Sequence, residues 1–295
     1  MVSRADAGAT RKHFQIGGGT VNVILWESPS SVSEAAVLGW VKTCASALAR
    51  YYGRLPVKEF ELSIFCEGDR GIHHGVAYPD RRIRITVGND TTEESLADDW
   101  MLTHEMFHLA FPGLDDDYLW MTEGFADYME PVARARIHLI SEEKFWKDLV
   151  EGCPQGLPEP GDQGLDMTPT WGRIYWGGVI YWLLADVEIR QHTHNKRSIR
   201  DAVLAILNDG GDITESWTLD KVLDVGDRAT GTGVLRELHQ QMGHTPFAPD
   251  LDSLWKSLGV VYGNGQVVFD DSAPLAEIRR AITRIGNPPP QGARP

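Results

Sequence analysis

Two histidines stand four residues apart in the segment His104-Glu105-Met106-Phe107-His108. On an α-helix, residues at this spacing lie on one face, so the two imidazoles could hold one metal ion together. Glu105 would then lie beside that ion, where a carboxylate can take a proton from a metal-activated water. Because so short a pattern also arises by chance, the rest of the chain must supply a third ligand.

The candidate third ligand is Glu123, which follows His108 after fourteen intervening residues and a Pro-Gly turn. A catalytic zinc ion takes three protein ligands and keeps one position open for water. Asp127, one helical turn after Glu123, could accept the second ring N–H of a coordinated histidine and fix its tautomer. A histidine pair at this spacing, taken alone, more often consists of surface or core histidines. A Glu followed four residues later by an Asp more often lies on a solvated helix face. In combination they predict a centre for one Zn²⁺ per chain.

Two predicted helices would carry these residues. Thr91 and Glu94 form a capping box for the first helix, which runs through both histidines and ends before Pro112. The second should open near residues 115–117, three aspartates that suit a helix N-terminus, and should bend at Pro131. A calcium site is the alternative reading of the three aspartates.

The remaining pattern places strands first and helices later. Strands are predicted at residues 20–26, 60–66, 75–78 and 82–87, with a helix at 33–52. After a Pro/Gly-rich loop at 152–169, helices are predicted at about 171–191, 198–208, 219–225 and 230–242. This order is typical of an α+β chain in which a sheet lobe precedes a helical lobe.

Both ends of the chain have compositions that cannot build a packed element. We therefore expect flexible tails at residues 1–12 and 286–295. Between them, a sheet lobe with the zinc-binding helices (13–130) and a helical lobe (131–285) would form one catalytic unit.

Composition excludes several classes of function. The net charge of −14 and the pI near 5.1 argue against a nucleic-acid groove, which needs excess Lys and Arg. No segment approaches the ~20 apolar residues of a membrane span, and the start lacks the apolar stretch of a secretory signal. A soluble protein without membrane insertion is expected, and the cytoplasm is slightly favoured. The compartment and the oligomeric state stay open.

The three widely spaced cysteines predict buried thiols.

Two segments carry a family resemblance. Residues 120–126, W-M-T-E-G-F-A, look like the W-x-x-E-G-F-A segment of the gluzincin metallopeptidases, such as the aminopeptidase N family. Residues 175–190 are similar to a long helix of the glycyl-aminopeptidase family, which a Tyr-x-Lys-Gly motif opens. Residues 251–260 resemble the end of that family's catalytic domain, so the resemblance covers roughly residues 35 to 260. It implies a thermolysin-like zincin fold with the active site in the cleft between the two lobes.

The resemblance also implies roles for particular residues. Tyr175 would donate a hydrogen bond to the oxyanion of the tetrahedral intermediate, a known kind of electrostatic stabilisation. The alternative is a buried structural tyrosine. An extended substrate could add to the strand at Gly75, Val76 and Ala77 through backbone hydrogen bonds, and the glycine would permit close approach. The neighbouring histidines at 73 and 74 could line the cleft. No role is expected for His13, His138, His192, His194, His239 and His244.

The sequence departs from that family at several points. Gly177 stands where the motif has its Lys. Residues 71–78 contain no Glu to bind a substrate's N-terminal amine, so exopeptidase specificity is not implied. The spacing between His108 and Glu123 is also shorter, and the family's accessory domains have no counterpart, as expected for a pared-down catalytic domain.

The implied function is a zinc-dependent metallopeptidase that hydrolyses peptide bonds by a metal-activated water, with Glu105 as general base. One alternative is a zinc hydrolase of a small amide or another non-peptide substrate. The other is a binding protein on an inactive peptidase scaffold, against which the intact Glu105 argues. Exopeptidase and endopeptidase activity are not distinguished.

Overall fold

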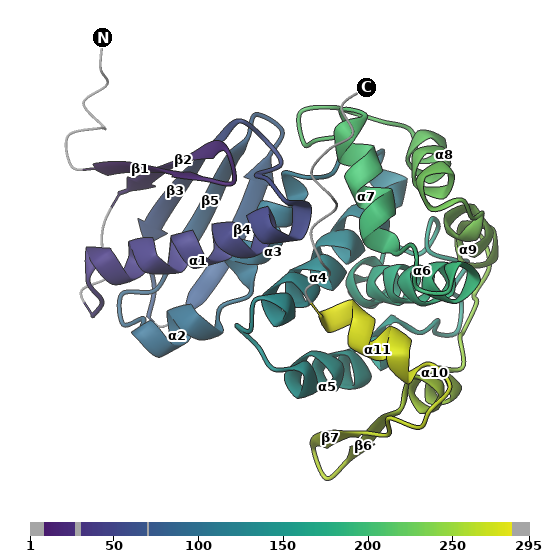
Figure 1. The fold of residues 1–295 in the computed structure, drawn as a ribbon. Helices are drawn as coiled ribbons and strands as arrows, with labels where there is room; N and C mark the ends of the chain where they lie inside the picture. Colours follow the sequence, from purple (N-terminus) through teal and green to yellow (C-terminus); the bar gives the residue numbers. More distant parts are fainter. Residues whose placement is uncertain (1–8, 27–30, 70, 285–295) are drawn as a thin grey trace.

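The computed structural model describes residues 9–26, 31–69 and 71–284. A sheet is formed near the N-terminus and helices make up most of the remainder (Figure 1), which confirms the α+β class. The strands of the sheet are β1 (Thr10–Ile16), β2 (Gly19–Leu25), β3 (Glu59–Cys66), β4 (Ile72–Tyr78) and β5 (Arg82–Val87).

The sheet has five strands in the order β1-β2-β3-β5-β4. It is mixed, because β2, β3 and β5 run parallel while β1 and β4 pair antiparallel with their neighbours. Strand β4 therefore lies at an edge of the sheet. Helix α1 (Glu34–Tyr52) follows β2 and matches the predicted helix; it begins after Ser33, whose side chain accepts from the Ala36 N–H, and ends at Gly53 with φ 78°.

Strand β1 was not predicted, and it begins inside the segment 1–12 assigned to a tail. Each residue from Thr10 onward pairs with β2, so the tail prediction is wrong for residues 10–12. Most residues of this strand are exposed and polar, and none is buried, so the sequence lacks the apolar alternation that predicts a strand. The predicted tail at 286–295 and the first eight residues lie outside the described residues.

The predicted histidine-bearing helix is two helices. α2 (Glu93–Asp98) is capped by Thr92, whose hydroxyl accepts from the Ser95 N–H. α3 (Met101–His108) begins after Asp99, whose carboxylate accepts from the first two N–H groups of the helix. The predicted capping box at Thr91 is therefore wrong, because that side chain bonds to the backbone of Gly71 instead.

The next helix, α4 (Leu119–Arg136), begins two residues after the last of the aspartates at 115–117, because Asp116 and Asp117 form a 3₁₀ turn with Tyr118. α4 continues through Pro131, so the predicted lobe boundary falls inside one helix. The remaining elements are α5 (Glu142–Gly152), a 3₁₀ turn (Cys153–Gly156), a π-helical turn (Arg173–Gly177), α6 (Gly178–Thr193), α7 (Ile199–Asn208), α8 (Leu219–Thr230), α9 (Val234–Met242), α10 (Leu251–Leu258), the hairpin β6 (Val260–Gly263) and β7 (Gln266–Phe269), and α11 (Ala276–Thr283).

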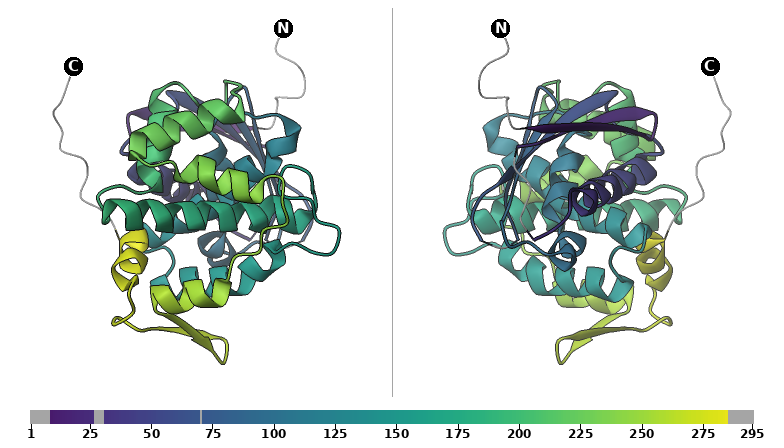
Figure 2. Two further views of the ribbon diagram at one scale, coloured as in Figure 1. Left: turned by 90° about the vertical axis from the view of Figure 1, so that its right-hand side faces the viewer. Right: turned by 90° about the vertical axis from the view of Figure 1, so that its left-hand side faces the viewer.

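The core is continuous from the sheet into the helices. Its buried apolar residues come from β2, β3 and β5 as well as from α1, α3, α4 and α6. Figure 2 shows the long helices stacked beside the sheet and the β6–β7 hairpin projecting from the opposite end of the molecule. Cys44, Cys66 and Cys153 are buried, as predicted. Within the described residues, none of the helices has the length and apolar character needed to cross a bilayer.

Candidate metal centre

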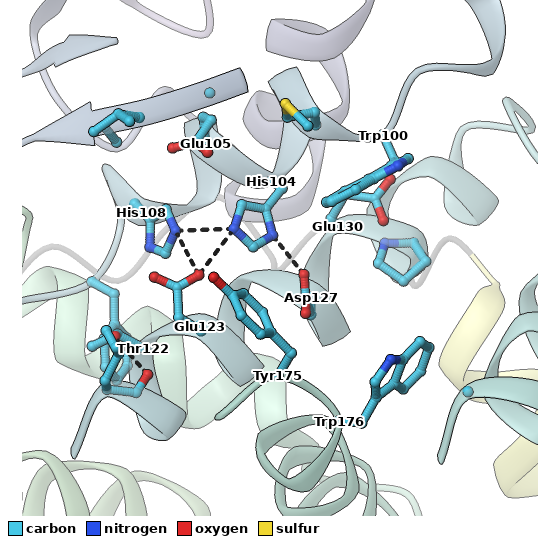
Figure 3. Close-up of a pocket in the computed structure, with 18 of the residues that line it drawn as sticks. Trp100, His104, Glu105, His108, Thr122, Glu123, Asp127, Glu130, Tyr175 and Trp176 are labelled. Carbon is cyan, nitrogen blue, oxygen red and sulfur yellow. Dashed lines mark hydrogen bonds and ion pairs between the residues drawn. The ribbon is translucent and has the colours of Figure 1, made fainter. Parts of the chain in front are cut away.

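The structure brings the three predicted ligand side chains together. The Nε2 atoms of His104 and His108 lie 3.2 Å apart, and Oε2 of Glu123 lies 3.3 Å from the first and 3.7 Å from the second (Figure 3). Ligand atoms at 2.0–2.1 Å from a tetrahedral zinc ion would be about 3.3 Å from one another. Two imidazole nitrogens and one carboxylate oxygen in this triangle therefore fit a zinc ion.

The short connection between α3 and α4 is sufficient because aromatic rings pack the two helices together. Phe111, just after α3, stacks on Phe125 of α4 with ring centroids 4.5 Å apart, and Phe107 meets the same ring edge-on at 6.1 Å. This packing holds Glu123, on the first turns of α4, opposite the two histidines. The shortened spacing therefore still delivers the third carboxylate to the histidine pair.

Asp127 contacts the outer nitrogen of His104. Its Oδ1 lies 2.7 Å from Nδ1, as expected for a carboxylate that orients a ligating imidazole. Burial alone would lower the pKa of His104, but the contacts with Asp127 and Glu123 outweigh burial and raise it to about 10. Burial and the charge on His104 lower the pKa of His108 to about 4. The two carboxylates thus favour positive charge at the point where the three ligand atoms meet.

Glu105 points from α3 toward the edge strand β4. Burial is the main cause that raises its pKa to about 7, and a hydrogen bond from the backbone of Ala77 opposes this. A Cβ atom at Gly75 would lie 2.7 Å from Cγ and 2.8 Å from Oε1 of Glu105. A larger residue at this position of β4 would therefore displace the Glu105 carboxylate from its place beside the strand.

A substitution at Gly75 is expected to disturb Glu105 without removing a ligand. For the hydrolysis proposed below, Gly75→Ala should lower kcat/KM by ~10²-fold, because a displacement of about 1 Å at a reacting group has an effect of that size. Metal content should stay at the wild-type value. Gly39→Ala is the matched control, since a Cβ there meets nothing within 4 Å. Wild-type kinetics in the Gly75→Ala protein would contradict the packing argument.

Tyr175 lies in the π-helical turn at Arg173–Gly177, and its hydroxyl points toward Glu123 and His104 (Figure 3). Burial, followed by the negative charges of Glu123, Asp127 and Glu105, raises its pKa to about 12. The phenol is thus a protonated donor at neutral pH. Turns of the π type occur often at functional sites.

Helices α4 and α6 cross with their backbones in contact beside this turn. A Cβ at Gly124 would lie 2.3 Å from Cα of Gly178, and a Cβ at Gly178 would lie 2.2 Å from the Trp120 carbonyl oxygen. Both positions therefore require glycine. Glu123 directly precedes Gly124, and Tyr175 stands three residues before Gly178, so the crossing places both side chains on the same cavity.

That cavity has a volume of about 1170 Å³ and lies between β4, α3, α4, α5 and the π-helical turn. The three candidate ligands, Glu105, Asp127 and Tyr175 all line it, as do Gly75, Val76 and Ala77 of the proposed substrate strand. His73 and His74 line its rim. Its apolar wall includes Trp100 and Trp171, which are 49% and 60% exposed.

Comparison with solved structures gives the fold. An aminopeptidase N family protein from Idiomarina loihiensis is similar, with a TM-score of 0.66 and 13% identity over 86% of this chain and 49% of that chain. An M1 zinc metallopeptidase from Deinococcus radiodurans has a TM-score of 0.55 and 13% identity, over 82% and 53%. This chain shares their fold. A variant of the Deinococcus protein, with a TM-score of 0.53 and 12% identity over 82% and 53%, is bound to a Tyr-Ser-Ala substrate.

The chain spans about half the length of these M1-type structures. No protein-family model matches the sequence, and no curated protein matches it significantly. The likeness to the M1 proteins is thus a likeness of fold.

Glu130 and Trp100 also line the cavity and were not predicted as part of the site. Glu130 is buried next to Arg134, with Oε1 2.7 Å from Nη1, and burial raises its pKa to about 7. Trp100 stands one helical turn before His104 and meets that ring edge-on at 5.7 Å. The position of Trp100, four residues before His104, could have predicted a place beside the histidine pair. Nothing in the sequence distinguishes Glu130 from an ordinary helical residue that pairs with an Arg four residues later.

Proposed function

We propose that this chain is a zinc-dependent metallopeptidase of the gluzincin type, which hydrolyses peptide bonds by a metal-activated water with Glu105 as general base. The observation that supports this proposal most strongly is that His104, His108 and Glu123 meet in one cavity, which the Glu105 carboxylate also lines. The M1-like fold and the peptide bound to one of its neighbours support the same reading. The proposed unit is a thermolysin-like catalytic domain, with the sheet lobe (13–130) and the helical lobe (131–285) meeting in α4.

The candidate centre would supply Lewis acidity and a water whose pKa lies near ~7. The chain's own groups perform the remaining work. Glu105 takes the proton of the attacking water and passes it to the leaving amine, and a carboxyl with a pKa of about 7 suits both transfers at neutral pH. Asp127 fixes the ring of His104, and Tyr175 donates to the developing oxyanion.

The proposed substrate is an extended peptide laid along Gly75, Val76 and Ala77 of β4, where an edge strand can accept another backbone. The exposed rings of Trp100 and Trp171 favour an apolar or aromatic side chain near the scissile bond. β4 has no carboxylate to hold a free amine, so peptides with blocked N-termini are expected to be cleaved too.

The test is turnover of a quenched peptide library by the zinc-loaded chain, with each peptide made with a free and an acetylated N-terminus. Cleavage of both forms is expected, and cleavage of free N-termini alone would make the protein an aminopeptidase. Glu105→Gln serves as the control for contaminating peptidases. A zinc-loaded chain that cleaves no peptide would overturn the peptidase proposal.

Tyr175→Phe is expected to lower kcat by ~10²–10³-fold with little change in KM, because one oxyanion donor is lost and the substrate's ground-state contacts remain. Steady-state kinetics on the best library peptide measure both constants. Tyr262→Phe is the matched control, because that phenol lies on the β6–β7 hairpin and bonds to Glu151. A rate within twofold of wild type would rule out the assigned role of Tyr175.

A further inference from the structure

A second group of metal-binding side chains lies away from the cavity. Nε2 of His239, on α9, lies 2.8 Å from Oδ2 of Asp166, and Nε2 of His244 lies 3.6 Å from the same oxygen. One ligand atom from each of the three residues falls within 4.8 Å of the other two. None of the three lines the cavity described above. The group therefore forms a cluster separate from the candidate metal centre.

Backbone contacts hold the two contributing segments together. The N–H groups of Leu165 and Asp166 donate to the carbonyls of Met242 and Gly243, at 2.8 and 3.0 Å. Gly164, with φ 101°, fits here only as glycine, since a Cβ would lie 2.4 Å from the Gly243 oxygen. The loop before the π-helical turn is thus laid against the end of α9, and Asp166 is presented to both histidines by the main chain.

The surroundings orient the side chains of the cluster. The indole N–H of Trp120 donates to Oδ1 of Asp166 at 2.9 Å, which leaves Oδ2 directed at the histidines. The His239 ring lies parallel to the Trp120 indole, with centroids 6.3 Å apart, and the His244 ring lies 5.8 Å from the His239 ring. The carboxylate and one imidazole are therefore fixed in place.

The carboxylate of Asp166 is buried beside the two histidines. Its side chain is only 4% exposed, and in the described part of the chain the groups within ion-pair distance of it are the two histidines. A carboxylate taken out of water is costly unless a positive charge compensates it. A divalent ion held by all three groups would supply that charge.

We propose that Asp166, His239 and His244 form a second transition-metal site of the zinc class. Two imidazoles and a carboxylate are a ligand set that zinc takes readily. The His244 side chain, 67% exposed, gives the ion a path from solvent and leaves room for water as a fourth ligand. Because Asp166 also holds Trp120, three residues before Glu123, the ion would fasten the loop, α9 and the first turn of α4 to one another.

The site is best counted in a chain that lacks the other centre. In the His104→Ala/His108→Ala protein, stripped with chelator and checked by near-UV circular dichroism, isothermal titration with ZnCl₂ is expected to give one bound ion. Adding His244→Ala or Asp166→Asn should weaken that binding by ~100-fold or more, because even partners outside the ligand shell contribute ~10–100-fold. His192→Ala, an exposed histidine on α6, is the control and should leave the affinity unchanged.

The wild-type chain provides an independent measurement that does not need the double variant to fold. It is expected to bind two zinc ions, and His244→Ala, which removes an exposed side chain, should bind one. Zinc beyond the first equivalent should raise the Tm of the wild type and not that of His244→Ala. An unchanged zinc affinity in His244→Ala and Asp166→Asn, or a folded His104→Ala/His108→Ala protein that binds no zinc, would overturn the proposal, whatever the result of the peptide assay.

Discussion

Glu123→Ala is expected to abolish zinc binding at the candidate metal centre and, with it, all hydrolysis. Oε2 of Glu123 faces both histidine nitrogens, at 3.3 and 3.7 Å, and among the described residues Glu123 completes this candidate ligand group. Removing it leaves two imidazoles, so the affinity for zinc should fall by well over ~10²-fold, more than the loss of an outer partner causes.

The zinc content should be measured after gel filtration by atomic spectroscopy, in the His244→Ala background so that the second site does not contribute. Thr122→Ala is the neighbouring control: its hydroxyl bonds to the Leu119 carbonyl, and it should keep one zinc ion. Stoichiometric zinc in the Glu123→Ala protein would show that the ligand assignment is wrong.

Glu105→Gln is expected to separate zinc binding from hydrolysis. The amide has the shape of the carboxylate and fits against Gly75 in the same way, so the zinc content should not change. The amide cannot accept the proton of the attacking water, and kcat should fall by ~10²–10⁴-fold, the usual contribution of a general base. The comparison needs zinc content and kcat on the same preparation. Loss of zinc together with activity would mean that Glu105 acts in the ligand shell instead.

Local periodicity was enough to predict most of the candidate site. His104 and His108 share a face on any helix, and Glu123 and Asp127 are one turn apart on the next, so only the meeting of the two helices had to be inferred. The packing of Phe107, Phe111 and Phe125 brings the two helices together, but the sequence pattern marks these three only as core residues. A sheet followed by helices was likewise predicted from the order of the elements.

The break between α2 and α3 was beyond the sequence pattern. Thr91 and Thr92 are equally good caps, and only the tertiary bond of Thr91 to Gly71 decides between them. Asp99 reads as a polar residue inside a helix, yet it starts a new one. The chemistry of a helix cap is local. Which of two adjacent threonines caps the helix depends on which side chain is already hydrogen-bonded elsewhere in the fold.

The second cluster could not be predicted at all. Asp166 and His239 are 73 residues apart and lie in a loop and on an unrelated helix. No periodicity relates them, and a lone histidine is seldom a ligand, which is why His239 and His244 had been given no role. Their meeting depends on the course of a loop, and loops follow turn geometry and contacts that a hydrophobic pattern does not encode.

The glycine-to-glycine crossing of α4 and α6 has a consequence for how such a protein could diversify. The main chains of α4 and α6 meet at Gly124 and Gly178. The distance between the backbones of Glu123 and Tyr175 is therefore set by how closely the two helices approach, and no side chain lies between them at the crossing. The aromatic wall at Trp100 and Trp171 belongs to other segments and is exposed. Substitutions there can reshape what the cleft admits while the backbone positions of Glu123 and Tyr175 stay fixed by the crossing, and they act on the chemistry only through the ring contacts of Trp100 with His104 and of Trp171 with Tyr175.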